Sequence, residues 1–257
     1  MSGNDTKRRW AMRRSFVGGP QAGDDVIRLN GIGPATAVLL LATSCSFELR
    51  SDIDMERLNE NVESLHRQGR YEEAAELAQK GLEIAEEHFG PDHPQVATSL
   101  NNLARAYAAQ GHYSRAEPLY QHSLEIREKA LGPDHPHVAM SLNNLAELYR
   151  VQGHYAQAEP LYQRSLEILE RVHGPDHHDV ALTLNNLGLL YVQQGHYAQA
   201  EPLLERALAI WEEALGPDHP HVATSLENLA MVYWLTGKAE AAKELGERAR
   251  AIRALER

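Results

Sequence analysis

The side chains best suited to chemistry recur in one short string, Gly-Pro-Asp-His, which begins at residues 90, 132, 174 and 216. In the second copy, Asp134, His135 and His137 offer a carboxylate and two imidazoles, which are donors that zinc sites use. Zinc holds its nitrogen ligands at about 2.0–2.1 Å, whereas packed helices lie about 8–10 Å apart, so equivalent histidines on stacked helices cannot share one ion. His135 and His137 are two residues apart and do not share a helix face. We therefore expect no metal site and no cofactor.

A structural role explains the same string more fully. The residue before a proline favours extended backbone, which suits a helix N-cap, and proline fits the first helical turn. His135 and Pro136 are therefore expected to begin a helix, with Asp134 beside its positive end. At the next boundary His178 replaces the proline and Asp179 follows, so that boundary is expected to be looser.

The rest of the sequence contains no recognisable catalytic set. It has no nucleophile–base–acid arrangement, no phosphate-binding glycine loop and no His-Glu-x-x-His motif. The net charge is −11, and residues 51–257 carry 32 acidic against 18 basic side chains, which disfavours nucleic acid because phosphate contacts need clustered Lys and Arg. We expect a protein that is not an enzyme and has a protein or peptide partner.

The four strings lie 42 residues apart and mark a tandem repeat. Residues 90–131 and 132–173 are identical at 29 of 42 positions. Within one unit, Val138, Leu142, Leu145 and Tyr149 form one helical stripe, and a second apolar stripe follows Gly153. Each unit therefore predicts two amphipathic helices, paired as 52–88, 94–131, 136–173, 178–215 and 220–256.

Small residues recur where the two helices of a unit must approach closely: Ala104, Ala116, Ala146, Ala158, Gly188 and Ala200. The pattern Leu142, Leu145, Ala146, Tyr149, Ala158, Tyr162 and Ser165 resembles the tetratricopeptide repeat (TPR). The usual period is 34 residues, and the longer period, with "DHPxVAxSLNNLAxLY", is similar to the repeats of kinesin light chain and of many bacterial TPR proteins. The resemblance implies an all-α fold, a right-handed α-solenoid of five repeats at about 52–89, 90–131, 132–173, 174–215 and 216–257.

Residues 1–50 differ from the array and are interpreted as a leader. A basic region precedes an apolar stretch from Gly31 to Ser44, which has the length of a signal-peptide core and is too short to span a membrane. The stretch closes on "LATSC", which resembles a bacterial lipobox with Cys45 as the lipidated residue, and "RRSFV" resembles a twin-arginine export motif. These features predict the cell envelope or periplasm. The alternatives are a disordered leader and a cytoplasmic protein.

Paired asparagines recur in mid-helix, where asparagine is a poor helix former. They are Asn101 and Asn102, Asn143 and Asn144, Asn185 and Asn186, and in the last unit Glu227 and Asn228. In the family that the repeats resemble, residues here point into the concave groove formed by the first helices. An amide carries both donor and acceptor, so the pairs could hold the backbone of an extended peptide or bridge adjacent repeats as a structural ladder. We predict peptide binding and keep the ladder as the alternative.

Groove positions further along each first helix vary between repeats. One turn on they are Arg105, Glu147, Leu189 and Met231, followed by Ala108, Arg150, Val192 and Trp234. The groove is thus expected to be charged early and apolar late, with Trp234 as an anchor for a ligand side chain or as the residue that closes the C-terminal core.

These features favour a non-catalytic scaffold that holds a peptide segment or partner protein. One alternative is a structural or tethering lipoprotein of the cell envelope. Another is a cargo adaptor like kinesin light chain, which residues 1–50 disfavour because they lack the long heptad region of that family.

Overall fold

The computed structural model describes residues 55–255, which are helical with short connections. Residues 55–67 form the first described helix. It is followed by α3 (Tyr71–Phe89), α4 (Pro94–Ala109), α5 (Tyr113–Leu131), α6 (Pro136–Val151), α7 (Tyr155–His173), α8 (His178–Gln193), α9 (Tyr197–Leu215), α10 (Pro220–Leu235) and α11 (Ala239–Leu255). The helix pairs expected between residues 94 and 255 are therefore the observed ones. The leader, including Cys45, lies outside the described residues.

A histidine N-cap begins each of α4, α6, α8 and α10. His93, His135, His177 and His219 have extended backbone, with ψ between 142° and 146°. Each imidazole Nδ1 accepts a hydrogen bond from the backbone N–H two residues on, at 3.1–3.3 Å. Such a bond satisfies one of the donors that a helix start leaves unpaired. This confirms that the histidine of the string serves as a helix cap, and α8 begins at the same point without a proline.

Glycines in the left-handed region separate the helices. Gly153 (φ 77°) stands between α6 and α7, and Gly174 (φ 88°) ends α7. The other repeats place a positive-φ glycine at the same two points. A side chain is strained at such a φ, so glycine there fixes where each helix stops.

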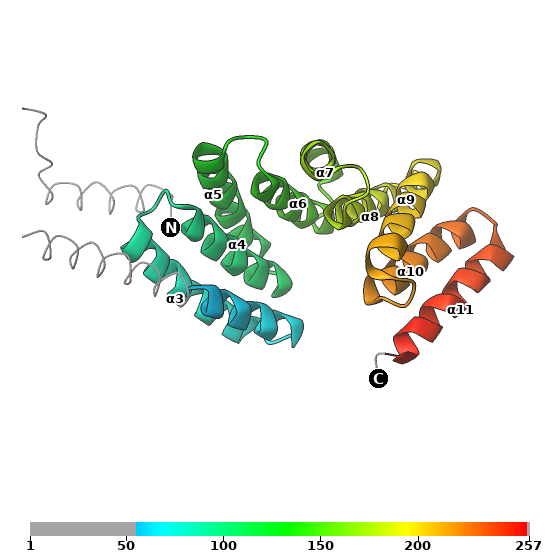
Figure 1. Ribbon diagram of the computed structural model, residues 1–257, viewed down its shortest axis with the longest axis horizontal. Coiled ribbons are helices and arrows are strands. Elements are labelled where there is room, and N and C mark those ends of the chain that lie inside the picture. Colours follow the sequence, from blue (N-terminus) through cyan, green and yellow to red (C-terminus); the bar gives the residue numbers. More distant parts are fainter. Residues whose placement is uncertain (1–54, 256–257) are drawn as a thin grey trace, which may run out of the picture. The chain divides into compact units, whose positions relative to one another are not determined.

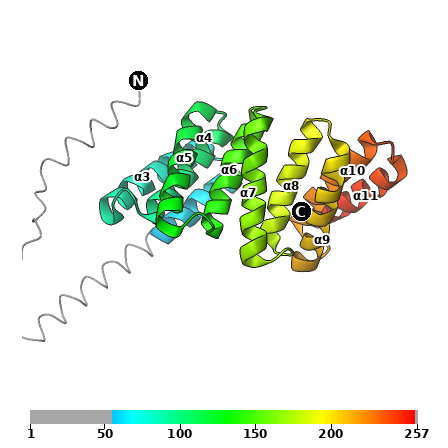
Figure 2. The same ribbon diagram turned by 90° about the horizontal axis from the view of Figure 1, so that it is seen from above.

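The helices pack as consecutive antiparallel pairs. We call the helix at 55–67, α4, α6, α8 and α10 the first helices, and α3, α5, α7, α9 and α11 the second helices. Each helix packs on its neighbours in sequence. Among α3–α11 the backbones of consecutive first helices also approach each other closely, whereas those of consecutive second helices do not. In Figure 1, α5 and α7 lie on the outer side of α4, α6 and α8, and Figure 2 shows the helices following one another in order. The first helices therefore form the more closely spaced layer of this α-solenoid.

The core lies between the two layers and depends on small residues. Ala146 and Ala158 are fully buried beside Leu145 and Tyr162. At Gly188, an added Cβ would lie 2.8 Å from Leu204, which is closer than such atoms pack, so the glycine permits α8 to approach α9. The hydroxyl of buried Ser165 on α7 donates to the Ala139 carbonyl on α6 at 2.8 Å, so this buried polar group has a hydrogen-bond partner.

Successive second helices are linked on their exposed side by arginines. Arg164, Arg206 and Arg248 pair with Glu128, Glu170 and Glu212, each 36 residues earlier. The same guanidinium groups donate to the carbonyls of Pro133, Pro175 and Pro217 in the linkers. One arginine thus ties two second helices to the linker between them. None of the helices between residues 55 and 255 is both long enough and apolar enough to cross a bilayer.

Candidate functional site

The paired asparagines form a continuous ladder across the first helices. The amide nitrogen of each second asparagine donates to the amide oxygen of the first asparagine in the preceding repeat. The four bonds are Asn102 to Asn59 (2.9 Å), Asn144 to Asn101 (2.9 Å), Asn186 to Asn143 (3.2 Å) and Asn228 to Asn185 (2.8 Å). The bridging arrangement that the sequence left open as an alternative is therefore present.

The ladder uses only part of each amide. Asn101, Asn143 and Asn185 are buried, whereas Asn144, Asn186 and Asn228 are partly exposed. Among residues 55–255, the amide oxygens of Asn144 and Asn228 accept no hydrogen bond, while that of Asn186 accepts from Asn185 at 3.5 Å. A row of amide oxygens along the first helices thus retains the capacity to accept hydrogen bonds from a ligand.

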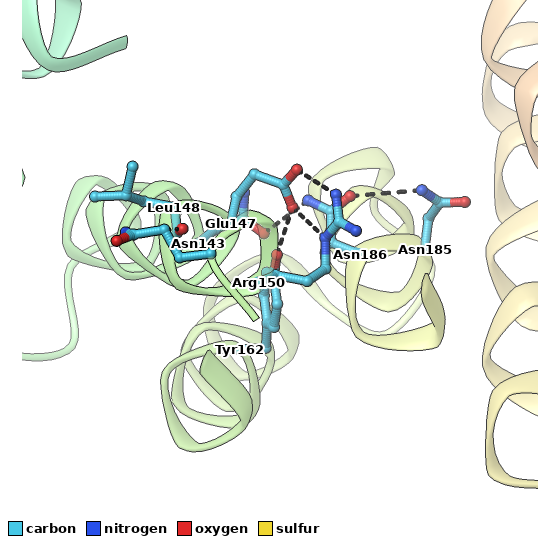
Figure 3. A network of polar contacts seen from close by, with 8 residues as sticks. Asn143, Glu147, Leu148, Arg150, Tyr162, Asn185 and Asn186 are labelled. Carbon is cyan, nitrogen blue, oxygen red and sulfur yellow. Dashed lines mark hydrogen bonds and ion pairs between the residues drawn. The ribbon is translucent and has the colours of Figure 1, made fainter. Parts of the chain in front are cut away.

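The charged groove positions of α6 neutralise each other. Arg150 makes a bidentate pair with Glu147, at 2.8 Å and 2.6 Å, and the hydroxyl of Tyr162 donates to the same carboxylate at 2.7 Å (Figure 3). The hydrogen bond to Glu147 raises the pKa of Arg150. Burial, followed by the nearby Glu147 charge, raises the pKa of Tyr162 far above its ordinary value, so its hydroxyl stays a donor. This trio links α6 to α7 and presents little net charge.

Arg105 stands at the position of Glu147 one repeat earlier, and it has no bidentate partner of the kind that Glu147 has. It lies 3.9 Å from Glu63, at the limit of an ion pair. Its Nε is buried and, within the part of the chain that the structure describes, has no hydrogen-bond partner. The early groove was expected to be charged, and Arg105 keeps its charge less closely paired, whereas Glu147 and Arg150 pair with each other.

The apolar positions predicted for the late groove are exposed to increasing degrees. Leu189 and Val192 are partly buried on α8, whereas Met231 and Trp234 on α10 are 40% and 70% exposed. At 70% exposure Trp234 does not close the C-terminal core, so that alternative was wrong. The core of the last helix pair, α10 and α11, contains instead residues such as Ile252, which is 2% exposed.

Exposed apolar side chains concentrate on the first helices. Of the nine large apolar residues exposed within residues 55–255, six lie on α6, α8 and α10: Met140, Val151, Leu182, Met231, Trp234 and Leu235. Of these six, only Met231 and Trp234 were expected from the sequence. Met140 and Leu182 are new to the candidate site, and they lie one helical turn before Asn144 and Asn186.

Two adjacent hollows contain these added residues. Met140, Asn143, Asn144 and Leu182 line a small pocket of about 70 Å³, whereas Leu182, Trp211 and His221 line one of about 290 Å³. Leu182 and Asp179 belong to both. Asn143 and Asn144 of the ladder therefore share one surface with Met140 and Leu182. We call the side of α4, α6, α8 and α10 that carries the ladder the first-helix face.

The sequence pattern that distinguishes Met140 and Leu182 is that residues at their repeat position change together with those at a second repeat position, the one held by Arg127 and Leu169. Thr98 and Thr224 pair with arginines, since Arg127 and Arg253 donate to their hydroxyls at 3.3 Å and 2.8 Å. Met140 and Leu182 instead share pockets with the equivalent Leu169 and Trp211. The central repeats thus replace polar pairs with apolar ones.

One linker also gathers metal-binding side chains. Ligand atoms of His173, His177 and Asp179 all lie within 4.8 Å of one another. The expectation of no metal site rested on equivalent histidines of different repeats and on the closely spaced pair of one repeat. His173, which ends the preceding helix, belongs to neither group.

Comparison with known proteins identifies the family. The family model for the tetratricopeptide repeat matches residues 54–129, 115–170, 137–213 and 197–254, so nearly the whole array is covered. The chain belongs to the tetratricopeptide repeat family. A search of curated proteins gave no match.

Solved structures place the chain beside kinesin-light-chain-like repeats within that family. It is similar to BtubC (BKLC) from P. vanneervenii, with a TM-score of 0.68 and 27% identity over 86% of this chain and 89% of that one. It is also similar to a putative kinesin light chain from Podosopora anserina with nearly identical TPR-like repeats, with a TM-score of 0.62 and 28% identity over 79% and 97%. PilF from Pseudomonas aeruginosa, at 19% identity and a TM-score of 0.56, shares the fold alone. TPR proteins of this kind generally mediate protein–protein interaction and are generally non-catalytic.

Proposed function

We propose that this chain is a non-catalytic scaffold that binds an extended segment of a partner protein along the first-helix face. The observation that carries the proposal is the concentration of exposed apolar side chains on α6, α8 and α10, six of the nine found between residues 55 and 255. Exposed apolar side chains gathered on one face favour a binding surface over chance, because scattered ones would be divided between the two layers.

The amide ladder supplies the polar part of this surface. An extended peptide presents backbone N–H groups at regular intervals, and they need acceptors when a partner covers them. The amide oxygens of Asn144 and Asn228 accept no bond from residues 55–255, and Asn102 and Asn186 stand at the equivalent positions of the other repeats. The row would therefore hold the peptide backbone without selecting its sequence.

Selectivity would come from the side chains around the row. Met140 and Leu182 would receive apolar residues in the middle of the face, and Met231 and Trp234 would do so at the α10 end. Arg105 adds a cation at the opposite end, so an acidic residue of the partner would fit there. Aromatic and arginine side chains are the types that most often dominate such interfaces.

The first experiment is capture of partners from a lysate by the immobilised chain, followed by affinity measurement with the partner identified. Met140→Thr with Leu182→Thr, and Trp234→Ala alone, install residues that other repeats carry at these positions, namely Thr98, Thr224 and Ala108. Each variant is expected to weaken binding about tenfold, since loss of an interface anchor costs about 1–2 kcal/mol.

Val172→Ala is the matched control because it removes an exposed apolar side chain from α7, a second helix, and Ala130 and Ala214 occupy its equivalents. It should leave affinity unchanged. If Val172→Ala releases the partner while both first-helix variants retain it, the partner binds the other layer and the proposal is wrong.

The amide row needs a separate pair of variants, because truncating an asparagine also breaks the ladder. Asn144→Ala and Asn101→Ala remove the same inter-repeat bond from its two sides. Only Asn144→Ala also removes an amide oxygen that a peptide could use. It should therefore weaken binding more than Asn101→Ala does. Equal losses, measured at equal folded fractions, would assign the row to structure alone.

A further inference from the structure

The linker between α7 and α8 differs from the other linkers at three positions, and all three differences converge. Where the other repeats have Phe89, Leu131 and Leu215, this linker has His173. Where they have Pro94, Pro136 and Pro220, it has His178, and where they have Gln95, His137 and His221, it has Asp179. An apolar residue, a proline and a neutral polar or histidine residue are thus exchanged for two imidazoles and a carboxylate around the histidine shared by all the linkers, His177.

The exchanged side chains meet around His177 in space. The rings of His173 and His177 stack with their centroids 4.4 Å apart. The Nδ1 of His177 lies 3.5 Å from an Asp179 carboxylate oxygen and 3.3 Å from the Nδ1 of His178. The Nδ1 of His178 lies 3.5 Å from the other Asp179 oxygen. Ligand atoms of His173, His177 and Asp179 therefore lie within 4.8 Å of one another, and His178 lies beside the latter two.

These separations match those of a metal site. Two ligands at about 2.0–2.1 Å from a tetrahedral zinc ion lie about 3.3–3.4 Å apart. The separations among His177, His178 and Asp179 are 3.3–3.5 Å, and the ligand atoms of His173 lie within 4.8 Å of those of His177 and Asp179. Imidazoles with one carboxylate suit Zn²⁺ and its transition-metal neighbours, whereas Ca²⁺ and Mg²⁺ prefer oxygen ligands. His177 and Asp179 are partly buried and His173 is exposed, so the point is accessible from solvent.

We propose that His173, His177 and Asp179, with His178 as a fourth donor, bind one divalent transition-metal ion such as Zn²⁺. The ion would join the last residue of α7 to the first turn of α8 and so fix the linker between two repeats. Its binding would replace the hydrogen bond from the Asp179 backbone N–H to His177 Nδ1, which at 3.3 Å is the longest of the four histidine caps.

The other linkers do not offer this set. The rings of His135 and His137 stack with centroids 5.1 Å apart, and those of His219 and His221 are tilted at the same distance. Leucines stand at 131 and 215, however, and prolines at 136 and 220. Between residues 55 and 255, the group around His177 is the one set of three such ligands found. One ion per chain is therefore expected from this part of the protein.

The test is calorimetric titration of the full chain, without a histidine tag, with Zn²⁺. The triple variant His173→Leu, His178→Pro, Asp179→Gln installs residues that other repeats carry, so its fold is expected to persist, as circular dichroism will show. The unaltered chain should bind one Zn²⁺ at least about 100-fold more tightly than the triple variant, because loss of ligands exceeds the 10–100-fold effect of outer-shell changes. Zn²⁺ should also raise the melting temperature of the unaltered chain alone, since an ion that binds only the folded state stabilises it.

His137→Gln is the matched control, because residue 137 is the equivalent of residue 179 and Gln95 occupies the same place in another repeat. It should bind Zn²⁺ as the unaltered chain does. The proposal is overturned if the triple variant keeps the affinity and stoichiometry of the unaltered chain, if the unaltered chain binds no Zn²⁺, or if His137→Gln abolishes binding. These outcomes do not depend on partner binding by the first-helix face.

Discussion

Arg127 on α5 shows how a single buried side chain can lower the stability of the folded chain. It is 5% exposed, and burial lowers the pKa of its guanidinium to about 10. Its hydrogen bonds go to neutral groups, namely the His137 carbonyl and the hydroxyls of Ser141 and Thr98. A buried cation without an acidic partner is only partly compensated for lost hydration. The next repeat avoids this cost by placing Leu169 and Met140 at the two equivalent positions.

Exchanging the polar pair for the apolar one should therefore stabilise the chain. Thr98→Met with Arg127→Leu is expected to raise the free energy of unfolding by about 1–2 kcal/mol, because buried ionic groups replaced by packed apolar ones often give such gains. Ser141 can turn its hydroxyl to a carbonyl four residues earlier, as Thr183 does to Asp179. Urea denaturation measures the change. Thr98→Met alone should lower the free energy of unfolding. A double variant less stable than the original chain would contradict this prediction.

His137 gives a pH dependence of known sign. Burial, with Arg127 and His135 nearby, lowers its pKa below 6.5 in the folded chain. The unfolded chain then takes up the proton first, so the stability contributed by neutral His137 is present above about pH 6.5 and is lost as the pH falls through the folded pKa. Between pH 7 and pH 5, His137→Gln should lose less stability than the original chain, as judged from denaturation midpoints. Parallel pH profiles for the two proteins would refute this.

At the scale of the helix, the sequence was informative because each boundary has a local cause. Histidine caps and positive-φ glycines fix the start and end of the helices whatever the neighbouring repeats do. The contacts between repeats were harder to predict. The ladder bond joins residues 43 apart, one more than the period, so a comparison of equivalent residues cannot reveal it.

The difficulty of predicting contacts between repeats also explains which residues of the candidate sites were missed. Asn59 belongs to the ladder and keeps the asparagine of the later repeats, but the next two residues, Glu60 and Asn61, depart from the repeat pattern, and Asn59 was not considered. His173 was missed because it ends a helix and is an exception to the repeat pattern. Residues that depart from the repeat are conspicuous only when their surroundings in space are known. Lipidation of Cys45 stays a prediction.

The arginine links between second helices allow a prediction for residue 122, where the arginine is replaced by histidine. His122 stands where Arg164, Arg206 and Arg248 stand in later repeats, and it is exposed. His122→Arg would place a guanidinium near Glu86 and the Pro91 carbonyl, the equivalents of Glu128 and Pro133. The expected gain in unfolding free energy is about 0.5 kcal/mol, the usual size for an exposed ion pair.

Arg164→His is the reverse exchange and should lower the stability by a similar amount, since it removes the pair with Glu128 and the bond to Pro133. Urea midpoints of the two variants decide the matter. If neither midpoint moves, the arginine links contribute nothing measurable.

For the whole array, the contacts are those of a one-dimensional chain of units. Each helix pair packs on its neighbours, and among α3–α11 direct contact does not extend beyond the next pair. Stability in such arrays is close to a sum of unit and nearest-neighbour contributions. The same substitution should therefore have different consequences in the middle and at the end.

Isoleucines at equivalent positions provide the comparison. Ile168 on α7 is 1% exposed and Ile252 on α11 is 2% exposed, so truncation to alanine removes a similar buried side chain from each. Ile168→Ala should cost about 2–5 kcal/mol and lower the midpoint of the main unfolding transition, because both neighbours of its unit lose support. Ile252→Ala should instead let the last pair open alone.

Hydrogen exchange separates the two outcomes. In Ile252→Ala, amides of α10 and α11 should exchange faster while those of α4 and α5 keep their protection, because the end pair contacts one neighbouring pair and not the far end. In Ile168→Ala, faster exchange should spread to the pairs on both sides of α7. Uniform acceleration from α3 to α11 in both variants would show that the array unfolds as one unit. The interfaces between repeats, including the asparagine ladder, would then be stronger than nearest-neighbour packing requires.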